Sequence, residues 1–218
     1  MRNRSENQIT LVLIRHGKTK SNEEHRYLGK TEEALSEKGK KEVLEYKTAQ
    51  GYPAVDCLFS SPMERCLQTA KLIYPELEPV CIPEWKEIDF GAFEGKNYQE
   101  LKEDKRYQEW IDKNGALPFP QGESRESFIR RCEKGFQRML KEIEEMKKYS
   151  MDMGNNEIEG RRGKKTIGMI VHGGTIMALL SQYGDEDYFD YQTANGRGYI
   201  CTWTKENGKA VFTDIRKL

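Results

Sequence analysis

Five side chains of the sequence have the types and the spacing needed to bind an oxyanion and to attack it. They are two arginines, two histidines and one glutamate: Arg15, His16, Arg65, Glu87 and His172. Arginine guanidinium groups bind phosphate or carboxylate through paired N–H donors. A neutral imidazole nitrogen can act as a nucleophile, and a carboxylate can protonate a leaving oxygen and later activate water. The set therefore predicts a site for a phosphoryl group.

Two glycine-containing turns agree with this prediction. Gly17 follows His16 and allows the chain to turn sharply beside a ligand. Gly173-Gly174-Thr175 opens an apolar helical pattern, and N–H groups at the start of a helix point toward an anion. The sequence has no GxxxxGK[ST] loop and no metal-ligand spacing near these residues. We therefore expect chemistry that uses neither a metal nor another cofactor.

The elements that must position these residues follow from the periodicity of the apolar side chains. Buried strands are predicted at Gln8–Ile14, Val55–Phe59, Glu78–Ile82 and Thr166–Val171, followed by a hairpin of Tyr199–Thr204 and Ala210–Ile215. Helices are predicted at Ser36–Gln50, from Ser61 onward, from Glu123 to about Tyr149, and at Gly173–Tyr183. Because strands alternate with helices, we predict a three-layer α/β/α fold with a mostly parallel sheet. Ligands of such sheets bind beyond the carboxyl ends of the strands, which is where the five reactive residues lie.

Three segments carry more specific expectations. Ser61 is predicted to cap its helix, with Pro62 in the first turn and Glu64 completing a capping box. Residues 84–120 are irregular, aromatic and charged, and we predict a small helical insertion over the active site, at about residues 88–123, within a single domain of residues 1–218. Four aromatic side chains in or beside it either line a pocket or pack the insertion: Trp85, Phe90, Phe93 and Trp110. The polar segment Ser150–Lys165 is predicted to be a mobile loop.

Composition excludes several classes of function. Lysine plus arginine number 36 and aspartate plus glutamate number 36, so the net charge is zero and a general nucleic-acid-binding face is not expected. No apolar run approaches the roughly 20 residues of a membrane helix, and the N-terminus lacks the apolar core of a signal peptide. The five cysteines are odd in number and scattered, which favours buried free thiols in a cytoplasmic protein.

The sequence LVLIRHGKTKSN, residues 11–22, resembles the RHG signature of the histidine phosphatase superfamily, which has the phosphoglycerate mutase-like fold. Five further segments continue the resemblance in the expected order over almost the whole chain: Gly29–Gly39, Ser60–Ala70, Glu84–Gly95, Pro120–Ser124 and Val171–Ile176. RHG alone is a weak signal, whereas the ordered set is specific. The resemblance is strongest to the α-ribazole phosphatase branch.

This resemblance implies roles for individual residues. His16 would be the phosphorylated nucleophile, and its phosphoryl oxygens would be held by Arg15, Arg65 and His172. Asn22 would make a secondary phosphate contact, and Gly173 would offer its backbone N–H. Spacing alone does not choose the acid/base among Glu84, Glu87, Asp89 and Glu94, but the motif match selects Glu87.

The sequence departs from the family pattern at two places. Lys18 stands where the family usually carries Glu or Gln. One hypothesis is that Lys18 favours a more anionic substrate; the alternative is that it points into solvent or meets a local acid. Glu32-Glu33 stands where the family often has Asp, and we expect a structural role for it.

The resemblance implies a metal-independent phosphatase that hydrolyses a small phosphomonoester through a phosphohistidine, with α-ribazole 5′-phosphate as one candidate substrate. A cofactor-dependent phosphoglycerate mutase is the first alternative, although mutases tend to carry a longer insertion than residues 88–123. A catalytically idle member of the fold is the second alternative. The expected partner is a small-molecule phosphomonoester, with no nucleic acid and no membrane, and the sequence does not determine an oligomeric state.

Overall fold

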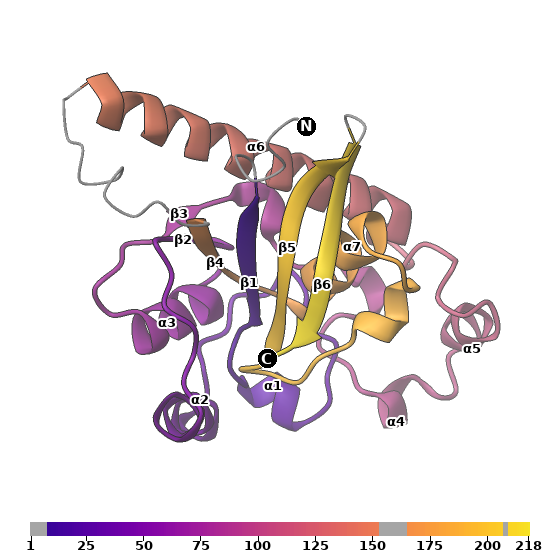
Figure 1. Cartoon of the computed structure of the whole chain (residues 1–218). Helices are drawn as coiled ribbons and strands as arrows, with labels where there is room; N and C mark the ends of the chain where they lie inside the picture. The colour runs from indigo at the N-terminus through magenta and orange to yellow at the C-terminus, as the bar shows by residue number, and fades with distance from the viewer. Residues whose placement is uncertain (1–7, 153–164, 207–208) are drawn as a thin grey trace.

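A six-stranded sheet with the order β3-β2-β4-β1-β5-β6 forms the centre of the molecule (Figure 1). The computed structural model describes residues 8–152, 165–206 and 209–218. The strands are β1 (Ile9–Arg15), β2 (Cys57–Ser60), β3 (Val80–Cys81), β4 (Lys165–Val171), β5 (Gly198–Glu206) and β6 (Lys209–Lys217). The first four strands are parallel, whereas β5 runs antiparallel to β1 and β6 antiparallel to β5. The predicted mostly parallel sheet and the predicted pairing of the last two strands are confirmed.

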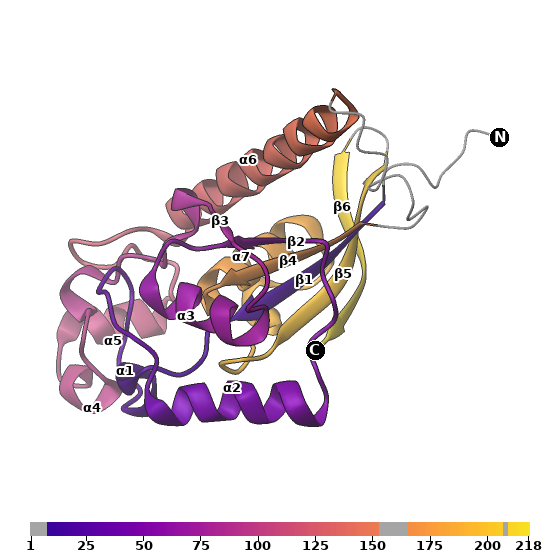
Figure 2. The same ribbon diagram turned by 90° about the vertical axis from the view of Figure 1, so that its left-hand side faces the viewer.

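Helices cover both faces of this sheet. They are α1 (Lys20–Glu23), α2 (Glu37–Ala49), α3 (Glu64–Ile73), α4 (Tyr98–Leu101), α5 (Lys105–Asp112), α6 (Arg125–Asp152) and α7 (Gly173–Tyr183). Figure 2 shows α2 and α6 on opposite sides of the strands. Short 3₁₀ turns are found at η1 (Pro83–Trp85), η2 (Gly91–Phe93) and η4 (Tyr188–Tyr191). The predicted three-layer α/β/α arrangement is therefore confirmed.

The alternation of side chains along β1 shows why this layering forms. Leu11 and Leu13 belong to the cluster that contains the α6 and α7 side chains, whereas Val12 and Ile14 pack with those of α2 and α3. All four are fully buried. A strand covered on both faces reads as a continuous apolar run rather than as alternating apolar and polar residues.

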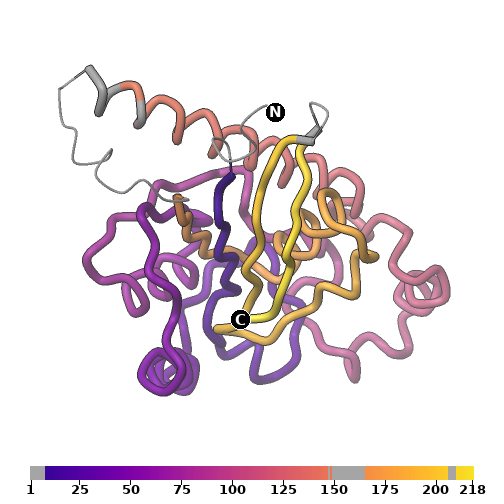
Figure 3. Tube along the Cα trace, viewed as in Figure 1, coloured from indigo at the N-terminus to yellow at the C-terminus, as the bar shows by residue number. Residues whose placement is uncertain are grey.

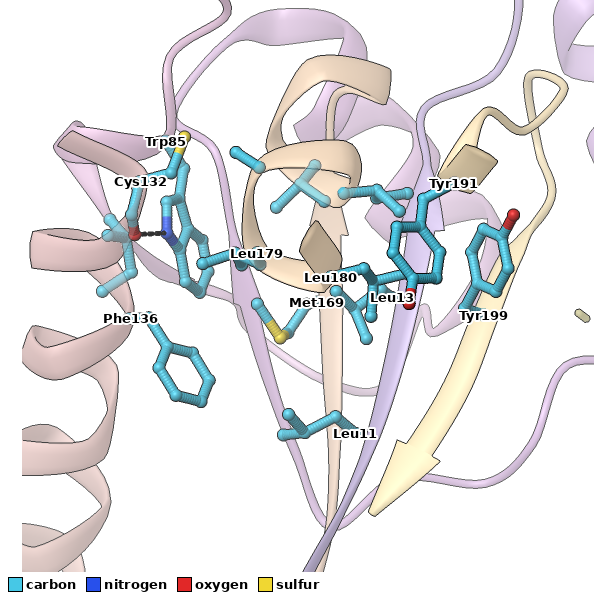
Figure 4. Packing of buried hydrophobic residues seen from close by; sticks show 14 of the residues in the cluster. Leu11, Leu13, Trp85, Cys132, Phe136, Met169, Leu179, Leu180, Tyr191 and Tyr199 are labelled. Carbon is cyan, nitrogen blue, oxygen red and sulfur yellow. Dashed lines mark hydrogen bonds between the residues drawn. The ribbon is translucent and has the colours of Figure 1, made fainter. Parts of the chain in front are cut away.

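The indole of Trp85 connects the η1 turn to α6 (Figure 4). Its Nε1 donates a hydrogen bond of 3.2 Å to the carbonyl of Cys132. A Cβ at Gly135 would lie 2.5 Å from Nε1, so only glycine lets the indole approach the helix this closely. This contact anchors the chain two residues before Glu87.

The segment between η1 and α6 lies beyond the carboxyl end of β1, where it packs against the loop that follows that strand (Figure 3). It contains the 3₁₀ turn η2 and the two short helices α4 and α5, which agrees with the helical character predicted for it. Trp85 and Phe93 are fully buried, and Phe90 and Trp110 pack in the same cluster. These aromatic side chains therefore hold the segment together. That residues 88–123 form an insertion in a single domain stays a prediction.

One sequence prediction needs correction, and another falls mostly outside the described residues. Helix α3 begins at Glu64, after an N-cap residue, Met63, that makes no side-chain capping bond, so the predicted capping box is wrong. The carboxylate of Glu32 accepts the backbone N–H of Glu64 at 3.0 Å instead. Most of the predicted loop Ser150–Lys165 lies outside the described residues.

The thiols follow their predicted environment with one exception. Three of them are buried and one is half-buried: Cys66, Cys132, Cys201 and Cys57. Cys81 is exposed because it lies on the short edge strand β3. Within the described part of the chain, no helix combines the length and the apolar character that crossing a membrane requires.

Candidate active site

Two histidines meet at the carboxyl ends of neighbouring parallel strands. Arg15 of β1 is in register with Val171 of β4, so His16 and His172 emerge side by side. Their ring centroids are 5.1 Å apart in an edge-to-face arrangement, and both residues are buried. Parallel pairing thus brings together two residues that are 156 positions apart in the sequence.

The hydrogen bonding of His16 leaves one ring nitrogen available for attack. Nδ1 lies 2.7 Å from the carbonyl oxygen of Gly17, which can only accept, so Nδ1 carries the proton. Nε2 therefore holds a lone pair. Burial, with the nearby charges of Arg65 and Arg15, holds the pKa of His16 well below its usual value. The ring is neutral and nucleophilic at neutral pH.

The imidazole of His172 is held by the hydroxyl group of Ser61. Its Nε2 lies 2.8 Å from the hydroxyl of Ser61, which was predicted to cap α3. The Sγ of Cys66 lies 3.6 Å from the same nitrogen. Burial, followed by the charge of Arg65, keeps the pKa of His172 well below its usual value. Ser61 thus orients a neutral imidazole, and no local pattern distinguishes this role from capping.

Both arginines keep unused donors at the site. Arg15 donates from Nη1 to the carbonyl of Thr193 at 2.8 Å, and Arg65 donates to the carbonyls of Thr31 and Gly29 at 2.9 and 2.7 Å. The Nε atoms of both arginines are buried without a hydrogen-bond partner among the described residues. Buried donors are rarely left without an acceptor in folded proteins. The donor set fits the oxygens of a tetrahedral oxyanion.

The loop of residues 29–31 holds the Arg65 guanidinium in place. Its carbonyls face Arg65, and its N–H groups at Gly29 and Thr31 donate to Oε1 of Glu94 at 2.8 and 3.1 Å. A Cβ at Gly29 would lie 2.1 Å from the carbonyl oxygen of Ile88, so this close approach requires glycine. Two motif segments that are distant in sequence thus hold the guanidinium of Arg65 in place.

Glu87 lies near Arg15 and Arg65 and against the start of α7. Its Oε1 accepts the backbone N–H of Ile88 at 2.9 Å and faces Gly174. Burial raises the pKa of Glu87 above its usual value, while the Ile88 N–H and the charges of Arg65 and Arg15 oppose that rise. A carboxyl group whose protonated form is favoured in this way is suited to donating a proton to a leaving oxygen.

The other three acids that spacing left open are engaged elsewhere. Glu84 pairs with Arg138 at 3.4 Å, and Asp89 pairs with Lys30 at 2.9 Å. Glu94 holds loop 29–31, as described above. The geometry therefore agrees with the choice of Glu87.

The two predicted binding residues lie close to the histidines, but Asn22 has a structural task as well. Its Oδ1 accepts the N–H of Thr19 at 3.2 Å in the capping box of α1, and the amide of Asn195 at 3.1 Å. Asn195 also donates to the carbonyl of His16 at 3.1 Å, a contact that the sequence did not indicate. Gly173 is the first residue of α7, and a Cβ there would lie 3.3 Å from Nε of Arg15.

The residues that depart from the family pattern are paired locally. Lys18 forms an ion pair with Glu42 at 3.0 Å, which is the local-acid alternative. Glu33 accepts the N–H and hydroxyl of Ser21, and Glu32 accepts the first N–H of α3. The expected structural role of Glu32-Glu33 is confirmed by these contacts.

Comparison with known sequences places this site in a family context. Residues 11–214 match the family model of the histidine phosphatase superfamily (branch 1). The chain is 30% identical over 136 residues to an adenosylcobalamin/alpha-ribazole phosphatase of Salmonella typhimurium, covering 60% of this chain and 67% of that protein. It is 33% identical over 138 residues to a bifunctional protein of Mycobacterium tuberculosis, covering 60% of this chain but only 37% of that protein.

Solved structures share the fold. A putative alpha-ribazole-5′-P phosphatase from Escherichia coli superposes with a TM-score of 0.72 at 22% identity, covering 94% of this chain and 95% of that one. At that identity the likeness shows the fold alone. A phosphoglycerate mutase from Thermus thermophilus superposes with a TM-score of 0.61 at 28% identity, covering 96% of both chains. Since the family model extends over nearly the whole sequence, the chain belongs to branch 1 of the histidine phosphatase superfamily.

Proposed function

We propose that this protein is a phosphatase that hydrolyses a small phosphomonoester through a phosphohistidine formed at His16. The observation that carries the proposal is the combination of a buried, neutral His16 with the two buried, unpartnered Nε donors of Arg15 and Arg65. A nucleophile and an oxyanion-binding group then share one site. The chemistry of this donor set also supports a reaction without a metal, because the arginines supply the positive charge that a phosphoryl group requires.

The first chemical step transfers the phosphoryl group to the enzyme. Nε2 of His16 forms a bond to phosphorus, the bond to the ester oxygen breaks, and Glu87 gives its proton to that oxygen as the alcohol leaves. Charge spreads over the three equatorial oxygens in the transition state, and the N–H donors of Arg15, Arg65 and His172 stabilise it there.

The second step reverses the role of the carboxylate. Glu87, now ionised, accepts a proton from water while the water oxygen attacks phosphorus and the phosphorus–nitrogen bond breaks. Inorganic phosphate is released, and both His16 and protonated Glu87 are regenerated. One carboxyl group can serve both steps because its raised pKa makes each protonation state accessible.

α-Ribazole 5′-phosphate is our leading candidate substrate, because an adenosylcobalamin/alpha-ribazole phosphatase is among the sequence relatives. A phosphoglycerate mutase is the second candidate function, favoured by the likeness to the mutase structure. Both reactions begin with phosphorylation of His16, and they differ in whether water or a second substrate accepts the phosphoryl group.

The test is phosphate release in the presence of EDTA by the wild type and by His16→Ala. The substrates are α-ribazole 5′-phosphate, 3-phosphoglycerate, fructose bisphosphates and p-nitrophenyl phosphate. Release that His16→Ala lowers by several powers of ten supports the phosphatase, and the preferred substrate names the branch. Exchange between 2- and 3-phosphoglycerate without release would make it a mutase. Activity that EDTA abolishes and metal restores would refute the metal-independent mechanism.

A further inference from the structure

One arginine of α6 binds the backbone carbonyls of Glu87 and of residues just before it. Arg131, in the second turn of α6, donates from Nη1 to the carbonyls of Glu84 and Lys86, both at 2.7 Å. Its Nη2 donates to the carbonyl of Glu87 itself at 3.3 Å. Three carbonyls within four consecutive residues thus converge on one guanidinium group.

Arg131 is itself held on its other edge. The carboxylate of Glu123 accepts from Nε at 3.1 Å and from Nη2 at 2.7 Å, which is the paired geometry that fixes a guanidinium plane. The backbone N–H of Glu123 donates in turn to the carbonyl of Asp89 at 2.9 Å. The guanidinium also lies 5.0 Å from the ring centroid of Phe128, a face-on cation–π contact. The Arg131 guanidinium is therefore held by a carboxylate, three carbonyls and an aromatic ring.

The hydrogen bonds of the Glu87 carboxylate come from backbone N–H groups, at Ile88 and at Gly174 in the first turn of α7. Ile88 is the next residue in the chain, so the bond to its N–H moves with the segment and does not fix it. The Trp85 indole anchors the segment before Glu87 to α6, but it makes no contact with the Glu87 backbone among the hydrogen bonds described. Arg131 is the side chain that ties the Glu87 carbonyl to α6.

We propose that Arg131, oriented by Glu123, is a positioning residue that fixes the acid/base carboxyl of Glu87 for proton transfer. This inference rests on the proposed function. A lysine in its place would keep the charge but could not reproduce the planar fork that reaches three carbonyls and a carboxylate. Displacing a catalytic group by about 1 Å is enough to lower a rate by about 10²-fold.

A positioning role predicts a loss that depends on the leaving group. An alkyl phosphate needs its leaving oxygen protonated, whereas 2,4-dinitrophenyl phosphate has a leaving group that departs without a proton. Arg131→Met should lower kcat/KM about 10²-fold for an alkyl phosphate such as glycerol 3-phosphate, and only a few-fold for the dinitrophenyl ester. A merely structural role would lower both values by the same factor.

Arg138→Met is the matched control. Arg138 lies two turns later on α6 and pairs with the side chains of Glu84 and Glu142, at 3.4 and 3.9 Å. Its substitution removes an arginine from the same helix without releasing the Glu87 backbone. We expect it to leave the ratio of the two kcat/KM values unchanged.

Glu123→Gln keeps the proposal testable if Arg131→Met does not fold. This substitution keeps the shape of the Glu123 side chain but removes one of the two oxygens that accept from Arg131. The ratio of kcat/KM for the alkyl phosphate to that for the dinitrophenyl ester should therefore fall, by a smaller factor than in Arg131→Met. If Arg131→Met and Glu123→Gln lower kcat/KM equally on both substrates, or leave the ratio of the two kcat/KM values as in the wild type, the positioning role is overturned. Wild-type protein that releases phosphate from neither substrate, nor from the panel above, would instead refute the proposed function, and the positioning role with it.

Discussion

Replacing Gly174 with alanine tests the placement of the Glu87 carboxyl group directly. Gly174 is the second residue of α7, and a Cβ there would lie 2.5 Å from Oε1 of Glu87. The same Cβ would lie 3.0 and 3.1 Å from two ring carbons of Phe128. Since ordinary contacts begin at 3.4 Å, the carboxyl oxygen must retreat by roughly 1 Å.

The size of the expected effects follows from this overlap. A shift of about 1 Å in a group that transfers a proton corresponds to about a 10²-fold loss of rate. Overpacking costs about 1–3 kcal/mol, but alanine is better than glycine inside a helix by about 1 kcal/mol, so the fold should survive. Gly174→Ala is therefore expected to lose much more activity than stability.

The assay compares kcat/KM for an alkyl phosphate and for 2,4-dinitrophenyl phosphate, alongside the midpoint of thermal unfolding. Gly173→Ala serves as a neighbouring comparison, because its Cβ would meet the Arg15 side chain at 3.3–3.5 Å rather than the carboxyl group. We expect Gly174→Ala to lose activity mainly on the alkyl ester and Gly173→Ala to lose it equally on both. A folded Gly174→Ala protein with the wild-type rate on the alkyl ester would refute the assignment of Glu87 as the acid.

Three further predictions follow from charge and burial. Because burial raises the pKa of Glu87 and lowers that of His16, activity on alkyl esters should persist below pH 6.5 and fall as rising pH ionises Glu87. A pH–rate profile checks this, and Glu87→Gln should abolish the alkaline limb; a limb that remains would contradict it. Lys18→Glu should leave the preference between mono- and bisphosphorylated substrates unchanged, because Lys18 is paired with Glu42, and a changed ratio in steady-state assays would revive a role in specificity. Phe136→Ala should cost about 3–5 kcal/mol in denaturant unfolding, because the ring is fully buried beneath α6, and a loss below about 1 kcal/mol would contradict the packing described.

The sequence alone determined the elements and the reactive residues at their ends. The run QITLVLI predicted a buried strand, and the structure has β1 at Ile9–Arg15, packed on both faces. The residues that follow such strands were predictable as site residues, because parallel strands end at one edge of the sheet. This is why His16 and His172 could be placed together before any contact was known.

Only the tertiary structure decided which partners orient these residues. The Ser61 hydroxyl suits a helix cap as well as an imidazole, and its choice of His172 depends on a contact between residues 111 positions apart. Asn195 reaches His16 across 179 positions, and Arg131 reaches Glu87 across 44. Hydrogen-bond donors such as these have many acceptors of equal chemistry within the chain. Folding selects among them by distance and burial, which no local pattern of residues encodes.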